Sequence, residues 1–156
     1  MHKAIHAVET PYVFTLDTDT ETFRGGFLQQ MVTLMKADDT LYALGWLRWV
    51  DKISGVPLEW HIKKQPPGKF IAYIHPSSGL YRVSLYHTLA PFFHHGAPCL
   101  DNMRAATLRG LRVSSFPISD YVKHLKAGTR RMYSGRWDPT EKTPRKPWRA
   151  KDDYPI

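Results

Sequence analysis

The chain has 156 residues, 42% hydrophobic and 13% aromatic, and this composition excludes a disordered chain and indicates one domain of ordinary size. Its single cysteine excludes an internal disulfide and the disulfide-rich class of small secreted proteins. The net charge of +8 and the isoelectric point near 9.7 are compatible with nucleic acid, an anionic membrane surface or an acidic protein as partner, and charge alone does not choose between them.

The N-terminal quarter of the chain predicts a strand followed by a helix. Residues 12–16 read as a short strand, and a helix follows from about Glu21 to Ala37. Its apolar side chains recur every three and four residues, which is the helical period, at Phe27, Leu28, Met31, Leu34 and Met35. Gly25 and Gly26 weaken the first turn, so a start at Phe27 is the alternative. Asp38 and Asp39 end the helix.

The middle of the chain predicts an antiparallel meander. Four strand candidates follow one another at residues 41–50, 58–63, 70–74 and 80–86. Turn-forming residues separate them at 54–55, 65–68 and 76–79, and short turns favour antiparallel neighbours. We interpret Trp46, Trp49 and Trp60 as core or sheet-surface packing, and His61 and His75 as ordinary strand and turn residues.

The rest of the chain predicts a long loop, two helices and a tail. Residues 87–102 contain Pro91, Gly96, Pro98 and Cys99, and a structureless stretch of this length is usually functional. Helices are expected at 103–111 and from about 119 to 133. The fold class is therefore α+β, with one domain over residues 1–136. Residues 137–156 are a basic, proline-rich tail with two aromatic anchors, Trp137 and Trp148.

This order of elements resembles that of the ubiquitin-conjugating enzymes: a helix, a meander, a cysteine-bearing loop and a helix. Three local motifs carry the resemblance: His87 after the last strand, Gly96-Ala97-Pro98-Cys99-Leu100-Asp101, and Phe116-Pro117-Ile118-Ser119-Asp120 at the entry to a helix. The segment Ala90-Pro91-Phe92-Phe93 is similar to bacterial relatives of this fold, some of them found in antiphage operons. The chain departs from the family where Thr88-Leu89 replaces the Pro-Asn that follows the family's histidine.

The resemblance implies that Cys99 accepts a ubiquitin-like protein as a thioester from an activating enzyme and passes it to a target, without a metal or small-molecule cofactor. A thiolate performs this exchange, so we expect Cys99 at the surface in a groove beside the sheet. His94, His95 and Asn102 are the local side chains able to donate to an oxyanion, while Asp101 could orient or deprotonate an incoming amine. The resemblance gives His87 the role of supporting the loop.

Several other interpretations stay open. Cys99 alone is more often a small buried hydrophobe than a nucleophile. His87, His94, His95 and Cys99 could bind a metal, or a histidine could make Cys99 a thiol hydrolase, although no spaced zinc or nucleophile signature is present. The main alternative is a non-catalytic basic module that binds nucleic acid or a protein, with the tail contributing charge and stacking. No apolar run suggests a signal peptide or membrane span, so we expect a cytoplasmic location and no membrane partner.

Overall fold

A mixed four-stranded sheet forms the centre of the protein in the computed structural model, which describes residues 2–52, 69–92 and 98–125. The strands lie in the order β1 (Tyr12–Leu16), β4 (Phe70–Arg82), β3 (Leu41–Asp51) and β5 (Arg112–Ser115). β4 runs antiparallel to both of its neighbours, whereas β5 runs parallel to β3. The α+β class predicted from the sequence is confirmed.

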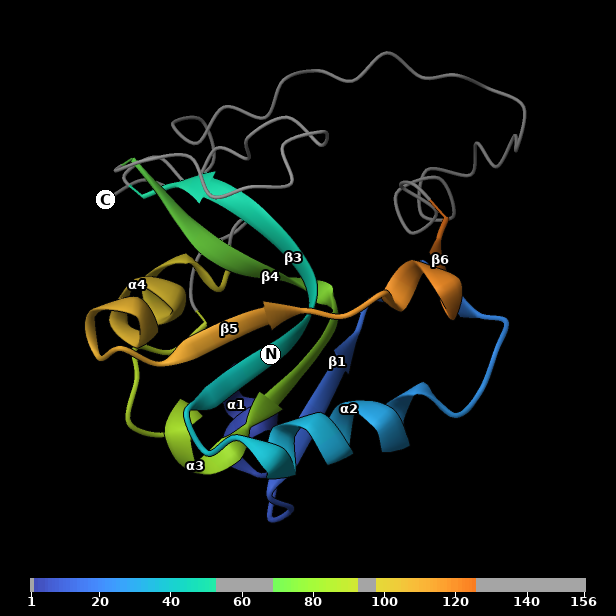
Figure 1. Ribbon diagram of the computed structural model, residues 1–156, viewed down its shortest axis with the longest axis horizontal. Helices are drawn as coiled ribbons and strands as arrows, with labels where there is room; N and C mark the ends of the chain where they lie inside the picture. The colour runs from blue at the N-terminus through green and yellow to red at the C-terminus, as the bar shows by residue number, and fades with distance from the viewer. Residues whose placement is uncertain (1, 53–68, 93–97, 126–156) are drawn as a thin grey trace.

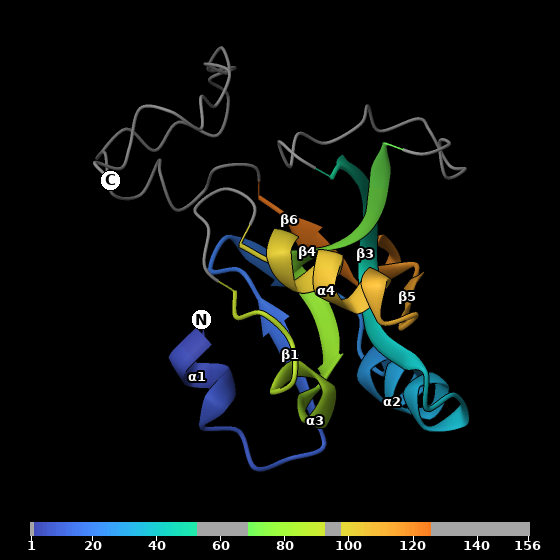
Figure 2. The ribbon, with the colours of Figure 1, turned by 90° about the vertical axis from the view of Figure 1, so that its left-hand side faces the viewer.

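Helices cover both faces of this sheet (Figures 1 and 2). One face packs against α1 (His2–His6), α3 (Val83–Tyr86) and α4 (Leu100–Leu108), and the other packs against α2 (Phe27–Ala37). A second sheet pairs β2 (Thr20–Thr22) with β6 (Val122–His124), and a 3-10 turn over Ile118–Asp120 precedes β6. The core is therefore divided into two clusters, one on each side of the central sheet.

The first half of the chain folds largely as its sequence predicts. The strand at residues 12–16, the strand beginning at Leu41 and the helix ending at Ala37 are confirmed. The longer helix from Glu21 is wrong, because Gly26 adopts a left-handed conformation at φ 85° and residues 20–22 form β2. The helix therefore begins at Phe27, and it ends where Asp38 becomes extended.

The predicted meander is wrong because β4 is one continuous strand over the expected turn at residues 76–79. The register places Gly45 opposite Gly79 and then resumes with Leu47 opposite Ile74, so β4 bulges at this point without reversing direction. The two glycines permit a very close approach: a Cβ on Gly45 would lie 2.4 Å from the Ser78 carbonyl oxygen.

The second half departs further from the prediction. β4 ends in α3, so residues 83–86 are helical, and α4 begins at Leu100 rather than at 103. The crossover through α4 returns the chain to the far side of β3, which makes β5 parallel to it. The helix expected from residue 119 is replaced by the 3-10 turn and β6 as far as His124. The strand expected at 58–63 and the tail at 137–156 lie outside the described residues.

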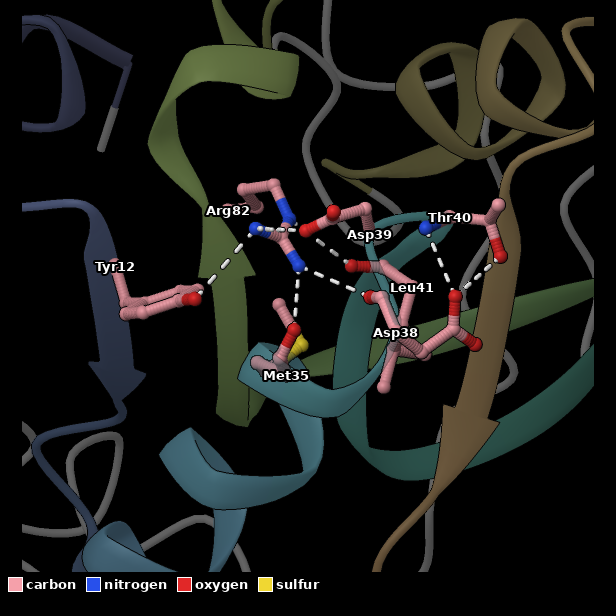
Figure 3. Close-up of polar contacts among 7 residues, drawn as sticks. All are labelled: Tyr12, Met35, Asp38, Asp39, Thr40, Leu41 and Arg82. Atoms are coloured by element: carbon pink, nitrogen blue, oxygen red, sulfur yellow. Dashed lines mark hydrogen bonds and ion pairs between the residues drawn. The ribbon is translucent and has the colours of Figure 1, made fainter.

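Arg82, the last residue of β4, ties the end of α2 to the sheet (Figure 3). Its guanidinium group donates to three backbone oxygens, at Met35 (2.5 Å), Asp38 (3.0 Å) and Leu41 (3.4 Å). It also lies over the Tyr12 ring, 5.4 Å from the centroid, and pairs with exposed Asp39 at 3.5 Å. Because the last carbonyls of a helix have no partner within it, Arg82 satisfies groups that the end of α2 leaves open.

Candidate functional site

Cys99 is fully buried between the sheet and α4, so the expectation that it lies in a surface groove is wrong. It occupies the position before the first residue of α4, and its carbonyl accepts the Met103 amide at 2.8 Å. Its sulfur lies 3.9 Å from the Tyr81 hydroxyl. The physical reason for the error is that an α4 beginning at Leu100 turns the thiol toward the apolar face of the sheet.

Burial raises the pKa of the Cys99 thiol from its ordinary value of 9.0 to about 12. Contact with the Tyr81 and Tyr73 hydroxyls lowers this pKa and the charge of Asp17 raises it, but loss of solvation is the largest effect. A helix N-terminus normally favours a thiolate, and here burial outweighs it. The thiol is therefore protonated at neutral pH and poorly suited to attack a thioester.

The tyrosines around Cys99 form a buried hydroxyl cluster, which we define as Tyr42, Tyr73 and Tyr81. Burial raises the pKa of all three above the ordinary tyrosine value of 10.0. The Tyr73 hydroxyl meets no partner in good hydrogen-bond geometry among the described residues. Tyr73 and Tyr81 stand near the two ends of β4, and no local pattern in the sequence connects them, because residues 70–82 had first to be recognised as one strand.

Asn102 has a structural contact for each end of its amide. Its oxygen accepts the Tyr42 hydroxyl at 2.5 Å, and its nitrogen donates to the Ala90 carbonyl at 2.6 Å. Asp101, on the first turn of α4, pairs with Arg104 at 2.5 Å. Asp101 and Asn102 are therefore neighbours of Cys99 in the sequence, but their described contacts are structural. Asn102 ties α4 to β3 and to the preceding loop.

His87 lies at the end of α3 and stacks on His6 of α1, with the ring centroids 4.7 Å apart and the planes within 3°. It also makes an edge contact with Tyr86. These contacts join α1 and α3, and the supporting role of His87 toward the cysteine loop, whose residues 93–97 lie outside the described part of the chain, stays a prediction. His94 and His95 lie outside the described residues.

His75 meets Ser77 where β4 bulges, an arrangement that the sequence did not predict. The His75 Nδ1 atom lies 2.7 Å from the Ser77 hydroxyl and accepts the Ser77 amide at 3.3 Å. Since Nδ1 accepts an N–H, the neutral ring carries its proton on Nε2. Ser77 is fully buried, so the pair stabilises the bulge and does not present a nucleophile to solvent.

No protein-family model, curated protein or solved structure matches the chain. In the described part of the chain, no group of three or more His, Cys, Asp or Glu side chains is placed to hold a metal ion. Nor does any helix within those residues have the length and apolar character needed to cross a membrane. The geometry of the chain itself is therefore the basis for a functional proposal.

Proposed function

We propose that the protein is a non-catalytic module that binds nucleic acid through its positive charge. The observation that carries the proposal is that the excess positive charge lies in the sequence after the described fold. The described residues are nearly balanced, with 11 Lys and Arg against nine Asp and Glu. The 11 residues from Lys126 to Arg136, directly after the described fold, contain four basic side chains and no acidic one. A basic run next to a folded domain is typical of contact with a phosphate backbone.

The surroundings of Cys99 support a binding protein over an enzyme. A nucleophilic cysteine normally has a lowered pKa and partial exposure, and Cys99 has the opposite of both. Asn102, the one candidate oxyanion donor among the described residues, is buried and both ends of its amide are hydrogen-bonded. These contacts are what a packed core requires.

The experiment is fluorescence anisotropy of the full chain with labelled single-stranded and duplex oligonucleotides of random sequence at increasing salt. If four phosphates of a single strand are contacted, affinity falls roughly 50-fold when salt rises about fourfold. Replacing three basic residues outside the described fold, Arg130→Gln with Arg131→Gln and Arg136→Gln, lowers the salt slope by about 2.

The control removes three exposed charges from the folded body, Lys3→Gln with Lys36→Gln and Lys123→Gln. This variant has the same net charge as the test variant and is expected to keep a steeper salt slope. The absence of any binding to either oligonucleotide at low salt would refute the proposal. An equal loss of slope in both variants would show that total charge matters and that its location does not.

The thioester-carrier hypothesis stays a prediction of the sequence. It requires Cys99 to leave its buried position, because the Tyr81 hydroxyl and α4 now occupy its surroundings. Incubation with ATP, an activating enzyme and a ubiquitin-like protein from the same operon tests it directly. A reductant-sensitive adduct that is lost in Cys99→Ala would establish the carrier function, and its absence would leave nucleic-acid binding as the conclusion.

A further inference from the structure

The outer parts of β3 and β4 form a two-stranded ribbon, which we define as Leu47–Lys52 with Lys69–Ile74. β1 pairs with β4 only from Ser78 to Arg82, and β5 pairs with β3 only from Leu41 to Gly45. The ribbon therefore pairs with no other strand among the described residues, and it projects away from α2 and α3 (Figures 1 and 2).

Lys52 and Lys69 lie opposite each other at the end of this ribbon, on the face that packs against α4. Residues directly opposite in an antiparallel pair share a face, and faces alternate along each strand. Val50 lies opposite Ile71, and both are buried in the cluster that includes α4. Two residues further along, the Lys52 amide donates to the Lys69 carbonyl at 2.9 Å, so the pairing continues. The two lysines therefore share the face of Val50 and Ile71, and both are exposed.

Arg104 of α4 brings a third positive charge to the same place. Its Nε atom donates to the Lys52 carbonyl, which fixes the end of the ribbon against the helix. Its Nη1 atom pairs with Asp101 at 2.5 Å, and its side chain is partly exposed. We define Lys52, Lys69 and Arg104 as the basic corner, because the ends of two strands and one helix bring them together.

The charges of the basic corner are not balanced among the described residues. Asp101 pairs with Arg104, but in that part of the chain no ion pair joins Lys52 or Lys69 to an acidic side chain. Asp51 points to the other face of the ribbon, because it precedes Lys52 on the strand. Like charges directly across a strand pair destabilise it. An anion placed between the two ammonium groups removes this repulsion.

We infer that the basic corner is where the folded body contacts the backbone of a bound nucleic acid, with a phosphate held between Lys52 and Lys69. The inference rests on the proposed function and adds a location to it. Side chains directly opposite each other start about 4.5–5.5 Å apart at Cβ, so two flexible lysines reach the oxygens of one phosphate. Such contacts position a nucleic acid without reading its bases, so oligonucleotides of unrelated sequence are expected to bind alike.

The opposite face of the ribbon provides an internal control. Trp49 and Phe70 lie there, are partly exposed, and share that face with the carboxylate of Asp51. A carboxylate repels a phosphate backbone, so this face is not expected to contact it. Trp46 differs from Trp49, because its contact with the α2-side cluster supports the interpretation of Trp46 as packing.

The first test measures the salt dependence of oligonucleotide affinity for the full chain with Lys52→Gln and Lys69→Gln. Loss of two phosphate contacts is expected to lower the salt slope by about 1.4 for a single strand and about 1.8 for a duplex. Lys52→Arg with Lys69→Arg keeps both charges and is expected to retain the native slope. Trp49→Leu, on the other face, is expected to leave the affinity unchanged. Circular dichroism and a melting curve verify that each variant is folded.

The second test uses the native chain, so it does not depend on how a variant folds. Lysine acetylation is mapped by mass spectrometry with and without bound oligonucleotide. Acetylation of Lys52 and Lys69 is expected to slow when the oligonucleotide is bound, whereas exposed Lys36 on α2 reacts as before. Inorganic phosphate alone, at the same ionic strength, is expected to protect neither lysine. Equal protection by inorganic phosphate would assign the corner to a free anion and overturn the inference.

The matched control for charge is Lys3→Gln with Lys36→Gln, two exposed lysines on α1 and α2. Equal salt slopes for the two glutamine variants, or a slope that the arginine pair does not restore, would overturn the inference while the native chain still bound nucleic acid. Weaker binding by Trp49→Leu would move the contact to the other face and also overturn it. A native chain that bound no oligonucleotide would refute the proposed function itself.

Discussion

The burial of Cys99 predicts that the native protein resists alkylation of its only thiol. Because the thiolate is the reactive form, the rate depends on how much of it is present and on whether reagent reaches it. With a pKa of about 12, roughly one thiol in 10⁴ is ionised near pH 8. An unfolded chain with the ordinary value of 9.0 has about one in ten ionised.

Ionisation alone therefore slows native labelling about 10³-fold relative to the unfolded chain. A second route is opening of α4 from the sheet, after which the thiol is solvated and regains its ordinary pKa. Opening of a core element costs a large part of the free energy of unfolding, commonly about 5–15 kcal/mol for a whole domain. Ionisation limits attack on the closed state and the opening free energy limits attack through the open state, so by either route the native rate is expected to be at least 10³-fold below the rate in denaturant.

The assay follows one alkylation event by intact mass, in buffer and in denaturant, since the chain has a single cysteine. The rate in denaturant is the control, because it measures the same thiol without the fold. A native rate within about tenfold of that control would refute both the burial and the raised pKa. That result would also revive the thioester-carrier hypothesis.

The same raised pKa makes the native state sensitive to alkali. The folded state binds the Cys99 proton more tightly than the unfolded state, so the thiol favours folding below pH 9.0 and this advantage is lost as pH rises toward about 12. The slope is about 1.4 kcal/mol per pH unit for one group. Cys99→Ala should therefore lose less stability than the parent between these two pH values, and parallel losses in urea titrations would contradict the assigned cause.

Three further substitutions test packing and hydrogen bonds by urea denaturation. Gly45→Ala is expected to cost about 1–3 kcal/mol, because the new Cβ meets the Ser78 carbonyl oxygen, whereas Gly25→Ala meets nothing and serves as its control. Arg82→Lys should cost about 2–4 kcal/mol, since lysine lacks the planar fork that binds the carbonyls at the end of α2, and an unchanged midpoint would contradict that role. Tyr73→Phe should leave stability unchanged or higher, because it removes a buried hydroxyl without a bond of good geometry, and a loss above about 1 kcal/mol would show that the hydroxyl is bonded.

Local sequence determined the elements in which the residue pattern and the residues that end the element both point to the same structure. In α2 the apolar side chains of Phe27, Met31 and Met35 follow the helical period and are all buried, and Asp38 ends the helix. β3 contains three aromatic residues, Tyr42, Trp46 and Trp49, and the β-branched Val50, which are residue types that favour a strand. These signals act within a few residues, so no knowledge of the rest of the fold is needed to interpret them.

The path of β4 could not be predicted in this way. Pro76, Ser77, Ser78 and Gly79 have turn chemistry, and a turn would have produced the meander. Pairing decides otherwise: Gly45 of β3 lies opposite Gly79, and β1 pairs with the same segment from its other side, so two neighbouring strands hold β4 extended through its bulge. A contact between residues 34 positions apart leaves no local signal in either segment.

The candidate site shows the same division. The sequence by itself determined that Cys99 is the only thiol and that positive charge accumulates after residue 125. Only the tertiary structure decided that Cys99 is buried, because its exposure depends on where α4 packs against the sheet. It also decided that Trp49 and Phe70 share one face of the β3–β4 pair, while Lys52 and Lys69 lie opposite each other on the other face. Burial and cross-strand pairing come from contacts between distant segments, and therefore they could not be predicted from local patterns.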